Sequence, residues 1–241
     1  MSHDHAQGAD VHFTQEFWDD RYRTAGQLWS GQPNQQLVAQ AAGLMAGDAL
    51  DVGSGEGADA IWLASQGWTV TAVDISAVAL ERAAAHAAAR GVEIAGRISW
   101  RQADLLTWSP GPQRFDLVSA QFMYLPGADL ESLHRRLAAA VRPGGTLLIV
   151  LHHPDDMQAG VGRGGSDDAP AAGGPEGLAG TSAGRAILAI GAQPGRLAAA
   201  LDPGGWDILV ADAIPRQVTA LDGQPATIKD TVLRAARRTG A

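Results

Sequence analysis

The sequence of 241 residues contains no cysteine. This absence excludes disulfides, thiolate catalysis, cysteine-bound zinc and iron–sulfur clusters. Lysine is almost absent too: Lys229 is the only one, and no phosphate-binding motif surrounds it. A P-loop kinase or a Schiff-base enzyme needs a lysine in a specific setting, so both are disfavoured. No apolar run reaches the roughly 18 residues that a membrane-spanning helix requires.

Positive charge is scarce as well. The 18 Lys and Arg residues face 26 Asp and Glu residues, which gives a formal net charge of -8. No basic stripe is visible that would neutralise nucleic-acid phosphates. Residues 1–8 lack both the basic and the apolar parts of a signal peptide, which predicts a cytoplasmic protein. We expect neither nucleic acid nor membrane as a partner, and the oligomeric state, monomer or homodimer, stays open.

Residues 49–57, Ala-Leu-Asp-Val-Gly-Ser-Gly-Glu-Gly, predict a short apolar strand that runs into a glycine-rich turn. Residues 58–64 predict the first turns of a helix. Glycines lack the Cβ atom that would block approach, so a ligand can lie against the bare backbone of the turn. The pattern Gly53-x-Gly55-x-x-Ala58 also fits the dinucleotide fingerprint, so the glycines alone do not identify the ligand.

Two acids separate the candidate ligands. Asp51 lies two residues before Gly53, and Glu56 lies inside the turn. A pyrophosphate in this place would be repelled by both carboxylates, whereas a cationic amino group would be attracted. S-adenosylmethionine carries an ammonium, a sulfonium and no phosphate, and its one carboxylate can face the helix N-terminus. The acids therefore favour this ligand.

Two further predicted strands, 68–74 and 98–104, also end in acids. In a βαβ unit Asp74 lies at the tip of the neighbouring strand, where it can accept hydrogen bonds from ribose hydroxyls. The alternative for Asp74 is a cap on the helix that begins near Ser76. Asp104 and Leu105 suit an adenine ring, with an acceptor for its amine and an apolar cover for its face. The alternative for Asp104 is a solvated loop residue.

The rest of the chain alternates helices and strands. A fourth strand is predicted at 115–122, a helix at 130–141, and a fifth strand at 146–152 whose unbroken apolar run is typical of a central parallel strand. Strands at 206–215 and 225–235 would form a hairpin through the Asp-Gly turn of residues 221–224. We expect an α/β fold with five parallel strands and this hairpin.

Three segments complete the predicted organisation. Residues 1–12 predict a flexible tail, 13–241 a single domain, and 158–184, rich in Gly, Ala and Pro, a mobile loop within it. Helices are predicted from Thr14, from Asn34 to Gly47, and weakly over 188–201. The aromatic residues before the first strand either pack in the core or form a lid over a small-molecule site; they are Trp18, Tyr22 and Trp29.

Together these segments resemble the class I S-adenosylmethionine-dependent methyltransferases. The resemblance covers about residues 48–152 and is carried by residues 50–57, Val73-Asp74, Gln102-Ala-Asp104-Leu105, 115–118, and 137–145 ending in Arg-Pro-Gly-Gly. Residues 17–22 and 29–34 are also similar to the bacterial tellurite-resistance and thiopurine methyltransferases. The resemblance implies a Rossmann-like doubly wound sheet of seven strands in the order 3-2-1-4-5-7-6, and S-adenosyl-L-methionine as the cofactor.

The resemblance also implies residue roles. The glycine turn would lie along the methionine part of the cofactor, with Asp51 facing its ammonium and Gln121 near its sulfonium. Asp74 would hold the ribose. Ile75 and residues 104–105 would contact the adenine. The predicted cofactor-binding residues are Asp51, Gly53, Ser54, Gly55, Asp74, Ile75, Asp104, Leu105, Gln121 and Trp29.

The expected reaction is methyl transfer by in-line displacement to an unidentified small molecule with a sulfur, oxygen or nitrogen nucleophile. Alignment supplies most of the catalysis, and a general base is needed only for a protonated acceptor. Tyr124, His152 and His153 follow strand tips where a base could act, but each could equally shape the pocket or pack. No metal site is predicted. The alternatives are a non-catalytic S-adenosylmethionine-binding protein of this fold and an NAD(P)-dependent oxidoreductase, which the acids and the lack of a Tyr-x-x-x-Lys pair oppose.

Overall fold

The structure, a computed structural model, describes residues 14–123, 125, 127–155, 193–219 and 224–240. Its strands are β1 Asp48–Val52, β2 Thr69–Asp74, β3 Ile98–Gln102, β4 Phe115–Gln121, β5 Val141–His152, β6 Trp206–Thr219 and β7 Pro225–Arg237. Its helices are α2 Gln15–Thr24, α3 Gln35–Ala41, α4 Ala58–Ser65, α5 Ala77–Ala89, α6 Val92–Gly96, α7 Gly127–Ala140 and α11 Pro194–Ala199.

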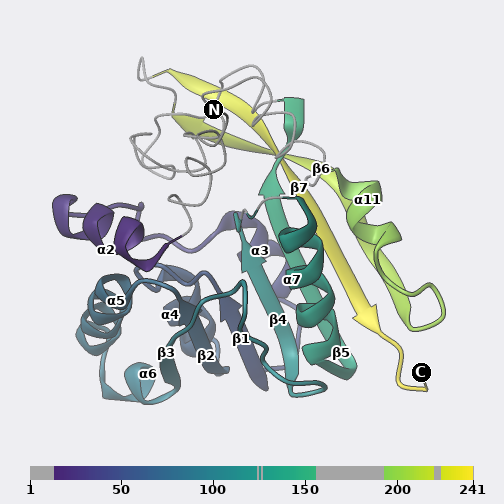
Figure 1. Ribbon diagram of the computed structural model, residues 1–241, viewed down its shortest axis with the longest axis horizontal. Helices are drawn as coiled ribbons and strands as arrows, with labels where there is room; N and C mark the ends of the chain where they lie inside the picture. Colours follow the sequence, from purple (N-terminus) through teal and green to yellow (C-terminus); the bar gives the residue numbers. More distant parts are fainter. Residues whose placement is uncertain (1–13, 124, 126, 156–192, 220–223, 241) are drawn as a thin grey trace, which may run out of the picture.

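All seven strands form one sheet in the order β3-β2-β1-β4-β5-β7-β6 (Figure 1). Strands β1 to β5 pair in parallel, and β7 pairs antiparallel with both β5 and β6. The predicted α/β class, the strand order and the C-terminal hairpin are therefore confirmed. The carboxyl ends of the parallel strands meet at one edge, which is where ligands of open α/β sheets bind.

Both faces of the central strands are buried, as the unbroken apolar run of β5 predicted. Leu147, Ile149 and Leu151 pack on one face with leucines of α7, which lies in front of β4 and β5 in Figure 1. Leu148 and Val150 pack on the other face against α3 and α4. Each fully buried leucine contributes about 1.5–3 kcal/mol, so this two-sided core fixes the sheet on which the site is built.

The start of α5 shows why a helix begins directly after β2. The Ser76 side chain accepts a hydrogen bond from the Ala79 N–H at 3.1 Å and so caps the helix. Ala79, Ala83 and Ala87 recur at helical spacing and are fully buried. Because these side chains are small, α5 lies close to the glycine turn, as the contact that Gly57 would make with Ala83 shows.

Several predicted boundaries were wrong. The Arg-Pro-Gly-Gly segment was expected to separate helix from strand, but α7 passes directly into β5, whose Val141 already pairs with Phe115. Strand β6 continues through Pro215, which was expected to end it, because proline is tolerated on an edge strand. Helix α6 was missed because five residues are too short to show a period.

Other predictions ended in different places or cannot be compared. Strand β3 ends at Gln102, so Asp104 lies in the following turn, and α3 ends at Ala41 instead of near Gly47. The predicted tail of residues 1–12, the loop of 158–184, residues 188–192 of the weak helix and residues 221–223 of the hairpin turn lie outside the described residues.

Gly57, which precedes α4, provides the first testable prediction. Its φ is +88°, and an added Cβ would lie 2.7 Å from Trp100 Cη2 and 2.8 Å from Ala83 Cβ. We expect Gly57→Ala to lower the free energy of unfolding by about 2–4 kcal/mol, since overpacking adds to the cost of a left-handed backbone. Urea unfolding measures the loss.

Gly67→Ala is the matched control for this steric argument. Gly67 has a similar φ of +93°, but its added Cβ would meet only Ala46 Cβ at 3.6 Å, an ordinary contact. The control should therefore lose only the backbone part, about 1–2 kcal/mol. Equal losses in the two variants would show that the close packing of the glycine turn against α5 and β3 contributes nothing.

Candidate functional site

The glycine turn joins the tips of three neighbouring strands. The N–H groups of Gly53 and Ser54 both donate to the Val73 carbonyl, at 2.8 and 3.0 Å, which ties the turn to β2. The Ala103 N–H donates to the Asp74 carbonyl at 3.0 Å, which ties the chain after β3 to the same place. The acids that the sequence placed at strand tips therefore share one edge of the sheet.

Asp74 organises the backbone at this edge. One carboxylate oxygen accepts the Gly55 N–H and the other accepts the Ser76 N–H, both at 2.9 Å. The side chain is only 8% exposed, and burial raises its pKa above the ordinary value. Asp74 thus supports the residue before α5, while the cap of that helix is Ser76 and not Asp74. Each Asp74 oxygen keeps a second lone pair that can accept a ligand hydroxyl.

Among the acids at the site, Asp51 has the least favourable surroundings for a negative charge. It is 2% exposed, and among the described residues its Oδ2 atom has no hydrogen-bond partner. Burial raises the pKa of this carboxyl well above its ordinary value, and the carboxyls of Asp59 and Asp74 raise it further. The Ala60 N–H acts in the opposite direction by stabilising the charged form. A cation bound here would relieve the unpaired charge.

Two more side chains of the predicted cofactor set carry unsatisfied buried atoms. The Ser54 hydroxyl and the Gln121 Oε1 atom have no partner within the part of the chain that the structure describes. Gln121 Nε2 donates to the Ser119 hydroxyl at 2.8 Å, so its free carbonyl faces elsewhere. Each unsatisfied buried group costs about 1–3 kcal/mol. A polar ligand that supplies the missing partners fits this cradle.

Asp59, in the first turn of α4, was not predicted from the sequence. This residue accepts the Asn34 N–H at 2.7 Å, and burial raises its pKa to about 6. An acid in the first turn of a helix is an ordinary stabilising feature, so nothing in the pattern marked it. With Asp51 and Asp74 it forms a cluster of three carboxyls whose pKa values are all raised by burial, so a bound cation would favour their charged forms.

The pH dependence of stability tests the environment of Asp59. Its pKa in the fold, about 6, exceeds the ordinary 3.8, so the stability from protonation is complete below about pH 4 and is lost as pH rises through 6. Asp59→Asn stays neutral and can still accept the Asn34 N–H. In urea unfolding without ligand, we expect the variant to match the wild type near pH 4 and to exceed it at pH 7–8. A difference that is constant across this range would contradict the buried-carboxyl account.

Glu56 has a different role from the one predicted. Its Oε2 accepts the N–H groups of Leu28 and Trp29, at 3.1 and 3.2 Å, and its Oε1 pairs with Arg82 at 3.1 Å. The side chain is buried and its charge is compensated. The prediction that Glu56 repels a ligand phosphate is therefore corrected: Glu56 holds the N-terminal segment against the turn.

Two aromatic residues of that segment lie over the glycine turn. Trp29 Nε1 donates to the Tyr22 hydroxyl at 2.8 Å, and a Cβ at Gly55 would meet these two atoms at 3.2 and 3.1 Å. Helix α2, next to α5 in Figure 1, is held by Asp19, which accepts the Ser76 hydroxyl at 2.6 Å. Tyr22 is 2% exposed and belongs to a core cluster against which Trp29 packs, so the packing interpretation holds for Tyr22, and a lid over the turn stays a prediction for Trp29. Trp18 packs on Tyr22, with ring centroids 6.2 Å apart.

The residues predicted to contact adenine differ in how deeply they are buried. Ile75 is half-buried at the tip of β2. Asp104 is exposed, and its carboxylate accepts the Leu106 N–H at 2.8 Å, which closes a local turn. Leu105 is 5% exposed and packs in the core with α7. The structure therefore brings Ile75 close to Asp74, while Asp104 lies at the solvent margin and Leu105 beneath it.

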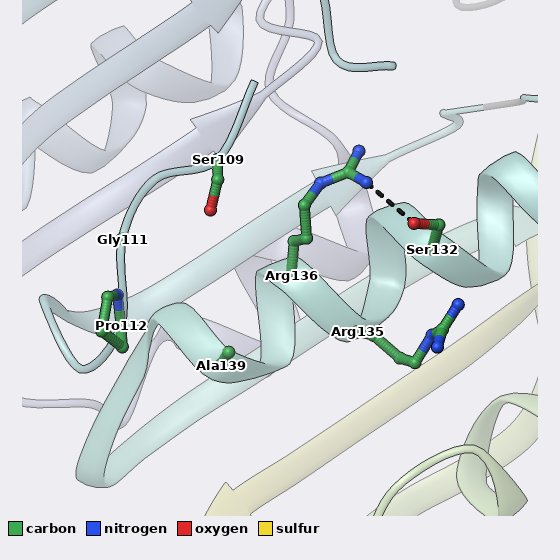
Figure 2. Close-up of a pocket in the computed structure, with 7 residues that line it drawn as sticks. All are labelled: Ser109, Gly111, Pro112, Ser132, Arg135, Arg136 and Ala139. Atoms are coloured by element: carbon green, nitrogen blue, oxygen red, sulfur yellow. Dashed lines mark hydrogen bonds between the residues drawn. The ribbon is translucent and has the colours of Figure 1, made fainter. Parts of the chain in front are cut away.

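A cavity of about 320 Å³ lies between the chain after β3 and α7 (Figure 2). Its Arg136 donates to the Ser132 hydroxyl at 2.9 Å and also to the Leu105 carbonyl. In Figure 2 Arg135 points away from Arg136, so the two guanidinium groups do not converge. None of the predicted cofactor residues lines the cavity. Arg136 stabilises the turn that carries Leu105 through its hydrogen bond to the Leu105 carbonyl.

The predicted bases have different surroundings. Tyr124 lies outside the described residues. His152 ends β5, where its ring stacks on Phe122 with a centroid distance of 4.3 Å. The His153 N–H donates to the Lys229 carbonyl at 3.0 Å, and its Nδ1 lies 3.5 Å from Asp155 Oδ2. Both histidines thus lie at the carboxyl edge of the sheet, on the side of β5.

The fold and the strand-tip residues together define a class of protein. A doubly wound sheet with a bare-backbone turn and three clustered carboxyls at its carboxyl edge, of which Asp51 has an oxygen without a partner among the described residues, is a small-ligand-binding α/β fold suited to a cationic ligand. Within the described residues, no helix combines the length and apolar character needed to cross a membrane. No group of three or more potential metal ligands was found in the same residues.

Comparisons with known proteins relate part of the chain to methyltransferases. Residues 49–145 match the family model described as a methyltransferase domain. The 2-heptyl-1-hydroxyquinolin-4(1H)-one methyltransferase of Mycobacteroides abscessus is 30% identical over 129 residues, 51% of this chain and 55% of that protein. The chain thus spans about half the length of this relative. These matches agree with the resemblance to the class I S-adenosylmethionine-dependent methyltransferases that the sequence shows.

Two solved structures share the fold. One, from work on the conversion of a disulfide bond into a thioacetal group in echinomycin biosynthesis, has a TM-score of 0.63 and 24% identity, and the match covers 95% of this chain and 94% of that one. The other, TehB from Haemophilus influenzae, has a TM-score of 0.58 and 16% identity, with 93% and 66% covered. At these identities the two likenesses show the shared fold alone.

Proposed function

We propose that this protein transfers a methyl group from S-adenosyl-L-methionine to a small-molecule acceptor with a sulfur, oxygen or nitrogen nucleophile. The observation that carries the proposal is the buried carboxylate of Asp51, whose Oδ2 lacks a partner among the described residues. It lies in the matched methyltransferase domain, directly before the glycine turn. When bound, the cofactor supplies a methyl group on a positively charged sulfur, which is already an activated leaving group.

The chain's own residues would hold and orient that ligand. Asp51 would pair with its ammonium, and the free lone pairs of Asp74 would accept the ribose hydroxyls. The unsatisfied atoms of Ser54 and Gln121 would each gain a hydrogen bond. Trp29, held by its bond to Tyr22, would cover the methionine side and exclude water. Ile75, Asp104 and Leu105 remain the proposed adenine contacts.

A dinucleotide coenzyme is the less favoured ligand. Glu56 no longer contributes to that argument, since Arg82 compensates its charge. Asp51, Asp59 and Asp74 still do, because no described cation pairs with any of the three. A pyrophosphate against the turn would add two negative charges to this cluster in a partly dry site, where like charges repel strongly.

The acceptor is proposed only at the level of a small molecule. The relative from Mycobacteroides abscessus is named for a hydroxyquinolinone substrate, so ring-bearing hydroxyl compounds are sensible first probes. We also propose that residues 13–241 act as one domain, because all seven strands form one sheet. The cytoplasmic location and the absence of nucleic-acid partners stay predictions from the sequence.

The experiment incubates the protein with methyl-labelled S-adenosylmethionine and, separately, phenols, thiols and amines, and measures label in the acceptor. We expect transfer to at least one class, and none with Asp51→Asn at the same protein concentration. Cofactor binding without transfer to any acceptor would instead favour the non-catalytic binding protein. A panel without either binding or transfer would reject the proposal.

A further inference from the structure

The segment between α2 and α3 is held in place by other parts of the chain. Residues 25–29 form bends and irregular backbone, yet Leu28 is buried and Trp29 is half-buried. The Ala25 N–H donates to the Arg21 carbonyl at 3.2 Å and so continues the hydrogen-bond pattern of α2 by one residue. Beyond that residue, the path of the segment depends on side chains that come from the glycine turn and from α5.

Glu56 of the glycine turn supplies the first of these contacts. Its Oε2 atom accepts the N–H groups of Leu28 and Trp29, at 3.1 and 3.2 Å. The side chain is 6% exposed, and hydrogen bonds to a charged group are stronger where water is excluded. The Glu56 carbonyl lies 3.1 Å from Nδ1 of His86, which ties the same residue to α5.

Arg82 of α5 supplies the second contact. Its Nη2 atom donates to the Ala25 carbonyl at 2.9 Å, and its Nη1 atom donates to the Gly26 carbonyl at 3.4 Å. The Nη1 atom also lies 3.1 Å from Glu56 Oε1. One guanidinium therefore holds both the segment and the carboxylate that accepts the N–H groups of the segment.

The side chain that this ion pair positions is Trp29. A Cβ at Gly55 would lie 3.2 Å from Trp29 Nε1, so the indole lies against the glycine turn. Trp29 Nε1 also donates to the Tyr22 hydroxyl at 2.8 Å. Tyr22 forms a buried cluster with Leu28 and with Ala79 of α5. The indole thus borders the turn along which the methionine part of the cofactor is proposed to lie.

We propose that Arg82 is a positioning residue for the cofactor: through Glu56 it holds residues 25–29 in place, and so keeps Trp29 against a ligand on the glycine turn. The hydrogen bonds of Arg82 go to a carboxylate and to two carbonyls of the segment, so its effect on the ligand is indirect. This inference rests on the proposed function and extends it by naming the group that keeps the ligand covered.

The physical reason is the burial of Glu56. Removal of Arg82 leaves that carboxylate without its ion-pair partner, and a buried pair that loses one partner is strongly destabilised. Water can solvate the carboxylate only if residues 25–29 move away from the turn. Trp29 moves with the segment, so a ligand on the turn loses its cover and its affinity falls.

The first test uses the ligand-free wild-type protein. Hydrogen exchange measured by NMR should give the amides of Leu28 and Trp29 protection factors at least about 10-fold higher than that of Gln27, because Glu56 accepts the first two. No described residue accepts the Gln27 N–H, although the residue lies next to Leu28 in the same segment. Equal protection of the three amides would overturn the proposal, even if no variant of Arg82 folds.

Substitution of the arginine extends this test. Without ligand, Arg82→Gln should speed exchange of the Leu28 and Trp29 amides by at least about 10-fold. It should also shift the indole ¹H–¹⁵N signal of Trp29, which is identified by its loss in Trp29→Ala. Arg97→Gln is the matched control, since Arg97 likewise forms an ion pair, with Glu93, and donates to a backbone carbonyl. Equal changes in the two variants, or none in folded Arg82→Gln, would reject the positioning role.

Calorimetric titration with S-adenosylhomocysteine connects the segment to the ligand. Arg82→Gln should weaken binding by about 10-fold, which corresponds to the loss of one charged hydrogen bond. Arg97→Gln should bind within about twofold of the wild type. A folded Arg82→Gln with wild-type affinity would overturn this inference and leave the proposed function standing. A wild-type protein that does not bind S-adenosylhomocysteine would reject the proposed function, and the inference with it.

A double variant shows whether the effect passes through the tryptophan. Trp29→Ala alone removes the indole from the turn and should weaken S-adenosylhomocysteine binding. Addition of Arg82→Gln to Trp29→Ala should then lower the affinity by less than about twofold further, because effects add fully only when two sites act independently. A second loss as large as that of Arg82→Gln alone would show that Arg82 acts by another route, and would overturn its role in positioning Trp29.

Discussion

Replacing Asp51 with asparagine should weaken S-adenosylhomocysteine binding by about 100-fold or more at pH 7.5 and stabilise the ligand-free protein. The affinity falls because the ligand ammonium loses a buried charged partner, which costs about 2–5 kcal/mol. The ligand-free fold gains because an unpaired, almost fully buried carboxylate is removed. We expect that gain to be roughly 1 kcal/mol.

The two effects have opposite signs, so one variant tests both. Calorimetric titration gives the affinity, and urea unfolding gives the stability. Because burial raises the Asp51 pKa, the stability gain should be largest at high pH and vanish at acid pH, where the wild-type carboxyl is protonated. Asp48→Asn, at the opposite end of β1 and exposed, is the control and should change affinity less than about twofold. A variant that binds normally would show that Asp51 does not face the ligand.

Asp74→Ala should reduce cofactor affinity by at least about tenfold, with the larger part coming from lost hydroxyl hydrogen bonds. Hydrogen bonds to a charged acceptor contribute about 1.5–3 kcal/mol each. The same change also frees the N–H groups of Gly55 and Ser76. Part of any loss could therefore come from a looser turn and helix start.

Ser76→Ala separates these contributions. It removes the cap on Ala79 and the bond to Asp19, and so loosens the same helix start while Asp74 stays in place. We expect a stability loss of about 1 kcal/mol, with affinity within about threefold of the wild type by calorimetry. Equal affinity losses in both variants, or none in a folded Asp74→Ala, would remove Asp74 from the ribose site.

The parts of the fold that were predictable depend on local pattern. Three features each depend on fewer than ten consecutive residues: the glycine turn, the acid at the tip of β2 and the apolar run of β5. Each lies where it was predicted. The strand order followed from the family resemblance. The boundaries that failed were decided by pairing instead: Val141 is a strand residue because Phe115 lies beside it, and Pro215 is tolerated because β6 is an edge.

A site residue could be predicted only where its place in the sequence, such as the end of a strand, was enough to mark it. Asp51 and Asp74 are at strand tips and were found, although their roles are still proposals. Glu56 was misjudged because its partners, Leu28, Trp29 and Arg82, are 26–28 residues away. The closeness of Asp230 to His152 was not predictable either, because it depends on antiparallel register between distant strands. No local pattern contains that information.

The most direct test of the account is a pair of calorimetric titrations of the wild-type protein at pH 7.5. One uses S-adenosylhomocysteine and the other NADH, at equal concentrations. The cluster of Asp51, Asp59 and Asp74, with which no described cation pairs, predicts saturable binding of the ligand that carries an ammonium and no phosphate, and no detectable heat from the dinucleotide. Binding of NADH as tight as that of S-adenosylhomocysteine would contradict the claim that negative charge at the strand tips selects the ligand.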